Sequence, residues 1–203
     1  MVSPRPHDLL RLSRPHVLPS DAPPWVSSVL GAAPWVVVRR APAPTGLIAV
    51  GVRGAIRSER YATEVALDDV CEVVAPEDVA HTPTQRELAV MSTLRTVRPH
   101  LDDTGLRWGP TGSVGFELAT GIPTATTESD LDLLVRVPHG SAEVLRCLAA
   151  LHREFGSRAV RVDCQVETSA GAVAMAELVG GPSDVMVRTA EGPRLVPRAV
   201  AVL

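Results

Sequence analysis

The chain has 203 residues, of which 45% are hydrophobic and 3% aromatic, and its formal net charge is -3. This length allows one or two domains with a sizeable core, and the hydrophobic fraction excludes a disordered chain. Long duplex nucleic acid is an unfavourable partner, because binding it requires a basic face that neutralises phosphates. Since we find neither an apolar run of membrane-spanning length nor a signal-peptide core, we expect a cytoplasmic protein.

The basic residues and the cysteines exclude further classes. All 20 basic residues are arginine, so the chain has no lysine for a Walker-type phosphate loop. Arginine instead binds phosphate bidentately. The cysteines Cys71, Cys147 and Cys164 are widely spaced and match neither a zinc site nor a disulfide framework.

Prolines divide the first third of the chain into short runs that are typical of strands. The elements expected there are a helix near residues 25–30 and strands at 35–40, 47–53 and 60–67. A polar, proline-bounded segment follows at 75–83. We therefore expect an N-terminal β-rich domain at 1–80 and a second domain at 81–203.

The second domain alternates helices and strands. Thr84 and Glu87 have the spacing of a capping box, which predicts a helix over 85–97. The other expected elements are a strand at 106–109, a short helix after Gly112-Ser113, a strand at 131–137, a helix capped by Ser141, a strand at 159–168, a helix at 172–179 and a hairpin of 185–189 with 194–196. The predicted fold class is α+β, with a mixed sheet covered by helices.

Two carboxylates, Asp130 and Asp132, stand two residues apart at the start of the predicted strand 131–137. This spacing places both on one face of the strand, while Leu131 and Leu133 point to the other face. Like charges at such positions repel unless a cation lies between them, and carboxylates are preferred ligands of magnesium. A strand end with two solvated aspartates is the alternative.

Gly112 and Ser113 lie on a turn between a predicted strand and a predicted helix. Free backbone N–H groups at such a helix start bind anions, and glycine allows a phosphate to approach closely. An ordinary serine N-cap is the alternative interpretation.

Asp163 lies on the predicted strand 159–168, on the face opposite Cys164. An antiparallel pairing with strand 131–137 would bring Asp163 beside Asp132. Three carboxylates would then hold two metal ions, as in phosphoryl transfer. A salt bridge with Arg161 or Arg136 is the alternative role of Asp163.

The order of these features resembles the polymerase-β-like nucleotidyltransferase superfamily. Over residues 106–170 the features occur in this order: a Gly-Ser turn, an Asp-x-Asp strand, a helix, and a lone Asp on a later strand. The separation between Ser113 and Asp130 is longer than in many members. Residues 120–128 are therefore either a flexible loop over the substrate or a sign that the Gly-Ser pair is misaligned.

A closer resemblance extends over nearly the whole chain. The segments TGSVGFELATG (111–121), SDLDLL (129–134) and VDCQVET (162–168) resemble those of the malonate decarboxylase holo-acyl-carrier-protein synthases. So do HDLL (7–10) and the segments 172–178, 187–189 and 192–195.

The resemblance implies transfer of a phosphoribosyl-dephospho-CoA group. The donor is 2'-(5''-triphosphoribosyl)-3'-dephospho-CoA, the acceptor is a serine of the apo acyl-carrier subunit, and pyrophosphate is released. Asp130, Asp132 and Asp163 would hold two magnesium ions, which manganese can replace. Gly112 and Ser113 would bind the triphosphate, and the N-terminal domain would dock the carrier or the substrate.

Arg188, beside the predicted hairpin turn, is a further candidate phosphate ligand, with a solvated hairpin charge as the alternative. Two other functions stay open. One is a nucleotidyltransferase of the same fold that acts on a small molecule or another protein. The other is a non-catalytic, nucleotide-binding partner, although retention of all three carboxylates argues against it.

Overall fold

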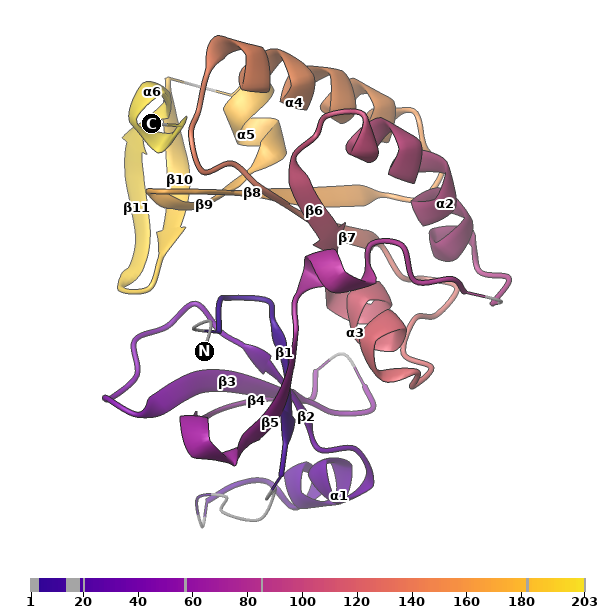
Figure 1. The fold of residues 1–203 in the computed structure, drawn as a ribbon, viewed down its shortest axis with the longest axis vertical. Coiled ribbons are helices and arrows are strands. Elements are labelled where there is room, and N and C mark those ends of the chain that lie inside the picture. The colour runs from indigo at the N-terminus through magenta and orange to yellow at the C-terminus, as the bar shows by residue number, and fades with distance from the viewer. Residues whose placement is uncertain are drawn as a thin grey trace. The chain divides into compact units, whose positions relative to one another are not determined.

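The computed structural model describes residues 4–13, 19, 21–56, 58–84, 86–181 and 183–202. The chain forms two compact units, Met1–Ala75 and Pro76–Leu203, which Figure 1 shows in indigo to purple and in magenta to yellow. The expected boundary at 80/81 lies a few residues later than this division, and segment 76–80 therefore belongs to the second unit. The expected α+β class, with a β-rich first unit, is confirmed.

The first unit is an antiparallel sheet with strand order β4-β3-β2-β1-β5. Its elements are β1 (Leu9–Leu12), α1 (Pro24–Ala32), β2 (Trp35–Val38), β3 (Leu47–Arg53), β4 (Arg60–Ala66), the 3-10 turn η1 (Leu67–Asp69) and β5 (Val70–Val74). Leu10 and Val50 are completely buried between the sheet and α1. The sequence patterns predicted α1 and β2 to β4 but not β1 and β5, which pair with each other.

The second unit contains a six-stranded sheet and most of the helices. Its elements are η2 (Pro76–Val79), α2 (Ala89–Asp102), β6 (Arg107–Pro110), α3 (Gly112–Thr120), β7 (Leu131–Arg136), α4 (Ala142–Gly156), β8 (Val162–Thr168), β9 (Gly171–Ala174), α5 (Met175–Gly180), β10 (Asp184–Thr189), β11 (Gly192–Pro197) and α6 (Arg198–Val202).

The sheet of the second unit is mixed, with strand order β11-β10-β9-β8-β7-β6. Strands β7 and β8 are parallel, whereas the other neighbouring strands are antiparallel. The expected antiparallel pairing of these two strands is therefore wrong. The reason is that α4 connects β7 to β8 as a crossover helix, which returns the chain to the same end of the sheet.

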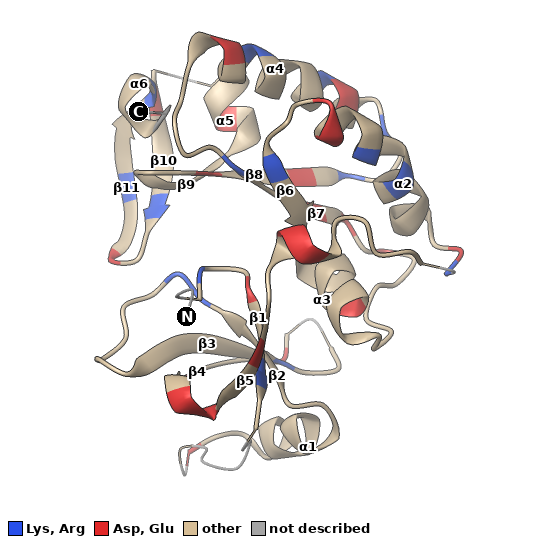
Figure 2. Cartoon of the chain, viewed as in Figure 1, with Lys and Arg blue, Asp and Glu red and all other residues tan. Residues whose placement is uncertain are grey.

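Helices α2, α4 and α5 lie together on one side of this sheet, and α3 lies beside β6 and β7 away from them (Figure 1). Apolar side chains from helices and strands form one core, in which Leu94, Leu133 and Leu148 are at most 1% exposed. Both basic and acidic segments lie on α2 and on α4 (Figure 2), so neither helix is uniformly basic.

Two local expectations differ from the structure, and a third agrees with it. Helix α2 begins at Ala89 after the N-cap Leu88, which has no side-chain cap, so the capping box of Thr84 and Glu87 is wrong; Gln85 lies outside the described residues. The expected helix 172–179 is a strand, β9, followed by the shorter α5. Ser141 does cap α4, since its hydroxyl accepts a hydrogen bond from Val144 N at 3.2 Å.

Candidate active site on strands β7 and β8

Asp132 and Asp163 lie side by side on the parallel strands β7 and β8. They are direct register partners, which places their Cα atoms about 5 Å apart. Neighbouring Leu131 is completely buried on the opposite face. The alternation of the sequence thus turns both carboxylates to the face opposite Leu131, where α3 begins beside β7.

Asp130 immediately precedes β7 and is half-buried, as are Asp132 and Asp163. The start of β7 is fixed by a hydrogen bond from Leu131 N to Arg161 O at 2.9 Å. The three predicted carboxylates therefore come from one end of two adjacent strands.

Arg161 forms a two-point ion pair with Asp163. Its Nε and Nη2 atoms each lie 3.0 Å from one carboxylate oxygen. The side chains of Arg161 and Asp163 are 71% and 47% exposed, so solvent screens the pair and its contribution to stability is small. Of the two salt-bridge partners considered from the sequence, Arg161 is therefore the one that Asp163 contacts.

Helix α3 begins directly against Asp132. Gly112 is its first residue and has a positive φ of 60°. A Cβ atom at Gly112 would overlap Asp132 Oδ2 and lie 2.8 Å from Asp132 Cγ. Thr111 N also donates a hydrogen bond to Asp132 O at 2.9 Å. The positive end of the helix dipole is thereby brought to the carboxylate pair.

Ser113 is not an N-cap. The N-cap of α3 is Thr111, without a side-chain cap hydrogen bond, and Ser113 lies inside the first turn. The Ser113 hydroxyl donates to Ser129 Oγ at 3.2 Å, directly before Asp130. The Gly-Ser pair and the Asp-x-Asp strand are thus connected in space, as the superfamily resemblance implies.

Arg188 lies at a distance from the aspartates. On β10 it is the register partner of Ala172 in β9, and Ala172 in turn pairs with Glu167 in β8. It is therefore two strands away from Asp163 and four residues further along the sheet, a separation of about 16 Å by strand geometry. The structure brings Asp132 beside Asp163 and Gly112 against Asp132, and it joins Ser113 to Ser129, the residue before Asp130. It does not bring Arg188 to them.

Motif reasoning missed a buried ion-pair group further along the same sheet face. Arg136 is 7% exposed, and it donates to Glu77 Oε1 and Glu167 Oε2, each at 2.6 Å. This group ties the η2 turn to strands β7 and β8. Glu167 is thereby held in an ion pair rather than placed beside Asp163.

The carboxylates fit the ligand chemistry of magnesium. Among the described residues, no three His, Cys, Asp or Glu side chains form a ready-made metal-binding group. Magnesium does not require such a cage, since it is commonly held by one or two carboxylates together with substrate phosphates and water. Asp132 and Asp163 are the two neighbouring carboxylates that could hold such an ion. Because Gly112 has no Cβ atom, the Asp132 carboxylate can lie directly against the backbone at the start of α3.

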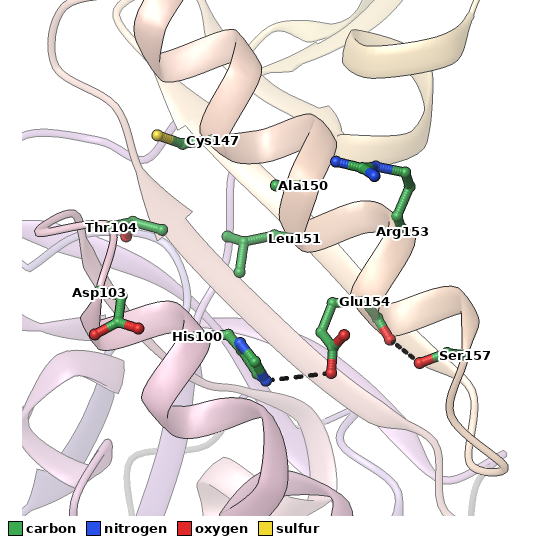
Figure 3. A pocket seen from close by; sticks show the side chains of 9 residues that line it. All are labelled: His100, Asp103, Thr104, Cys147, Ala150, Leu151, Arg153, Glu154 and Ser157. Carbon is green, nitrogen blue, oxygen red and sulfur yellow. Dashed lines mark hydrogen bonds and ion pairs between the residues drawn. The ribbon is translucent and has the colours of Figure 1, made fainter.

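A cavity of about 500 Å³ lies elsewhere in this unit, between α2 and α4. Figure 3 shows His100 and Glu154 at its wall, where His100 Nε2 lies 3.3 Å from Glu154 Oε1. Cys147 also lines it. None of the six candidate site residues does, so this cavity is separate from the carboxylates of β7 and β8.

The chain matches known protein families over nearly its whole length. Residues 77–199 match the family described as phosphoribosyl-dephospho-CoA transferase MdcG C-terminal domain, and residues 5–76 match the corresponding N-terminal domain. These matches make the chain a transferase. It belongs to the phosphoribosyl-dephospho-CoA transferase family.

Individual relatives agree with this family. A phosphoribosyl-dephospho-CoA transferase of Pseudomonas fluorescens is 43% identical over 96% of this chain and 93% of its own. One of Azotobacter vinelandii is 41% identical over 95% of this chain and 92% of its own. No solved structure matches significantly. No helix in the described parts of the chain is both long and apolar enough to span a membrane.

Proposed function

We propose that the chain transfers a phosphoribosyl-dephospho-CoA group from 2'-(5''-triphosphoribosyl)-3'-dephospho-CoA to a serine of the apo acyl-carrier subunit of malonate decarboxylase. The names of its relatives support the transferred group, and the sequence resemblance supports the carrier. One observation carries the site: Asp132 and Asp163 are neighbours on parallel strands, and the first residue of α3 packs against Asp132.

The reaction forms one bond and breaks one bond at a single phosphorus atom. The serine oxygen of the carrier attacks the α-phosphorus, and its proton is released. The bond between this phosphorus and the bridging oxygen of pyrophosphate breaks, so that the product is a phosphodiester. The developing negative charge lies on phosphate oxygens, and its stabilisation is the main catalytic requirement.

Asp130, Asp132 and Asp163 would hold two magnesium ions, or manganese ions in their place. When bound, these ions would neutralise the triphosphate and polarise the reacting phosphoryl group. The backbone N–H groups at Gly112 and Ser113 would bind the triphosphate, because α3 directs its positive end there. Arg188 would serve only an anionic group of the substrate that lies far from the reacting phosphorus.

Arg161 would control access to Asp163. It is a fixed cation that already pairs with the carboxylate needed for the metal. If Asp163 held an ion, Arg161 would compete with that ion for the carboxylate, and its guanidinium could instead pair with a phosphate of the substrate. Because the pair is exposed, separating Arg161 from Asp163 would cost little free energy.

The test is intact-mass analysis of the apo carrier after incubation with the enzyme, magnesium and the triphosphoribosyl donor. We expect the carrier to gain one phosphoribosyl-dephospho-CoA group, and Asp132→Asn to slow this by about 10³-fold or more. Unfolding temperature should not fall, because the substitution relieves repulsion between carboxylates.

Asp184→Asn is the matched control. Asp184 is an exposed carboxylate on β10 of the same sheet, so the same substitution there should leave the rate unchanged. An unmodified carrier with the wild-type enzyme would refute the proposed reaction. Full activity of Asp132→Asn would refute the metal assignment.

A further inference from the structure

Glu117, on the second turn of α3, is a buried carboxylate that binds the loop leading to the active site. Its side chain is 8% exposed. Its Oε2 atom accepts hydrogen bonds from Thr124 N at 2.8 Å, from Ala125 N at 2.9 Å and from Arg86 Nη1 at 2.7 Å. Arg86 Nη1 also donates to Ala125 O at 3.0 Å. We call Glu117 and Arg86 the loop clamp.

The clamped loop spans residues 121–130, which form neither helix nor strand. Glu117 and Ser113 stand four residues apart on α3 and therefore share a helix face. At the Ser113 end, Ser129 Oγ accepts hydrogen bonds from Ser113 Oγ at 3.2 Å and from Thr126 N at 2.9 Å. The loop is thus held at both ends of one face of α3.

We infer that the loop clamp is a positioning device for the triphosphate site. By fixing residues 124 and 125 it fixes the register of the loop, and so places Ser129 and Asp130 against the first turn of α3. This inference rests on the proposed triphosphate-binding site at that turn, formed by the backbone N–H groups at Gly112 and Ser113. Residues 120–128 lie in the long separation between Ser113 and Asp130. They are then not a flexible loop over the substrate but a segment bound to α3, the helix that forms the triphosphate-binding site.

The burial of the Glu117 carboxylate explains why the loop is held against α3. A buried carboxylate is unfavourable unless donors surround it, and here two backbone N–H groups and one guanidinium do so. Without the Glu117 carboxylate, the N–H groups of Thr124 and Ala125 lose their acceptor, and the loop is free to leave α3. Ligand binding must then bring the loop back, which weakens affinity.

The test measures binding of inorganic tripolyphosphate, in the presence of magnesium, by titration calorimetry on the full chain. Glu117→Ala should bind about tenfold more weakly or worse, because both loop amides lose their partner. Glu117→Gln keeps an oxygen acceptor for these amides and should bind within about threefold of the wild type. Near wild-type affinity in Glu117→Gln would show that Glu117 acts by accepting hydrogen bonds from the loop and not through its negative charge.

Arg86→Met and Glu154→Ala complete the design. Arg86 is 39% exposed at its side chain, and without it Glu117 keeps its two backbone donors. Its removal should therefore weaken binding only about threefold. Glu154 pairs with His100 and Arg158 at the cavity in Figure 3, and its replacement should leave tripolyphosphate binding unchanged. Hydrogen exchange at Thr124 and Ala125 should be faster in Glu117→Ala than in the wild type or in Glu154→Ala.

The outcomes separate the two proposals. If the wild type binds no tripolyphosphate, the proposed triphosphate-binding site at α3 is refuted, and the inference with it. If the wild type, Glu117→Ala and Arg86→Met all bind tripolyphosphate equally well, the positioning role of the loop clamp is refuted, whereas the triphosphate-binding site at α3 is supported. If Glu117→Ala does not fold, wild-type affinity in Arg86→Met is sufficient to reject the clamp.

Discussion

Replacing Gly112 by alanine should separate backbone strain from displacement of a catalytic carboxylate. Gly112 has a φ of 60°, and an L side chain in this left-handed conformation costs about 1–2 kcal/mol. For a chain of this size, that corresponds to a fall of about 2–8 °C in unfolding temperature. The new Cβ would also overlap Asp132 Oδ2 and lie 2.8 Å from Asp132 Cγ.

The overlap affects function more than stability. The Asp132 carboxylate is the movable end of a side chain, so it can turn away by about 1 Å, and a misplacement of that size lowers a rate about 10²-fold. We therefore expect Gly112→Ala to transfer the prosthetic group about 100-fold more slowly. Manganese affinity, measured by electron paramagnetic resonance, should fall as well.

Gly105→Ala is the matched control for Gly112→Ala. Gly105 has a similar φ of 66°, but a Cβ there meets nothing within 4 Å. It should lose the same few degrees in unfolding temperature and retain its full transfer rate and manganese affinity. Equal rates for Gly112→Ala and Gly105→Ala would refute the contact between α3 and Asp132 as a feature of the active site.

Two further predictions follow from the neighbourhood of Asp163. Arg161→Gln should bind manganese up to about fivefold more tightly, because the ion no longer competes with an exposed ion pair; weaker binding would contradict this competition. Burial, and to a lesser degree the charge of Asp163, raises the pKa of the Cys164 thiol, so that it stays neutral and unreactive. At pH 8 a thiol reagent should modify exposed Cys71 and reach Cys164 only on unfolding, as peptide mapping would show; labelling of both at equal rates in the folded protein would contradict this.

The part of the site that the sequence could predict is local. Asp130 and Asp132 are two residues apart at the start of a strand, and strand geometry alone puts them on one face. Leu131 and Leu133 alternate with them and are buried, as their apolar character predicts. The position of Gly112-Ser113 at a helix start followed similarly from a glycine between a strand and a helical run.

The elements that sequence patterns missed depend on distant partners. β1 and β5 are four and five residues long, and each becomes a strand by pairing with chain remote in the sequence. Residues 172–174 were expected to begin a helix, but as part of β9 they lie between β8 and β10 and complete the sheet there. Thr84 and Glu87 have the spacing of a capping box, yet the helix begins at Ala89.

Glu117 illustrates the limit of motif reading at the site. In the sequence it is one polar residue in a short helix, and nothing in its spacing relates it to Arg86 or to Thr124. Its function as an acceptor exists only because the loop folds back along α3 and offers two N–H groups. Arg136 is similar, since its partners Glu77 and Glu167 lie on remote segments.

By itself, the sequence determined the candidate residues of the site and the strand face on which Asp132 stands opposite Leu131 and Leu133, because side-chain alternation is a local property of the backbone. Only the tertiary structure decided that Asp163 is beside Asp132 through a parallel pairing, and that Gly112 packs against the same carboxylate. Strand direction and register depend on how α4 returns the chain across the sheet, which no single strand encodes.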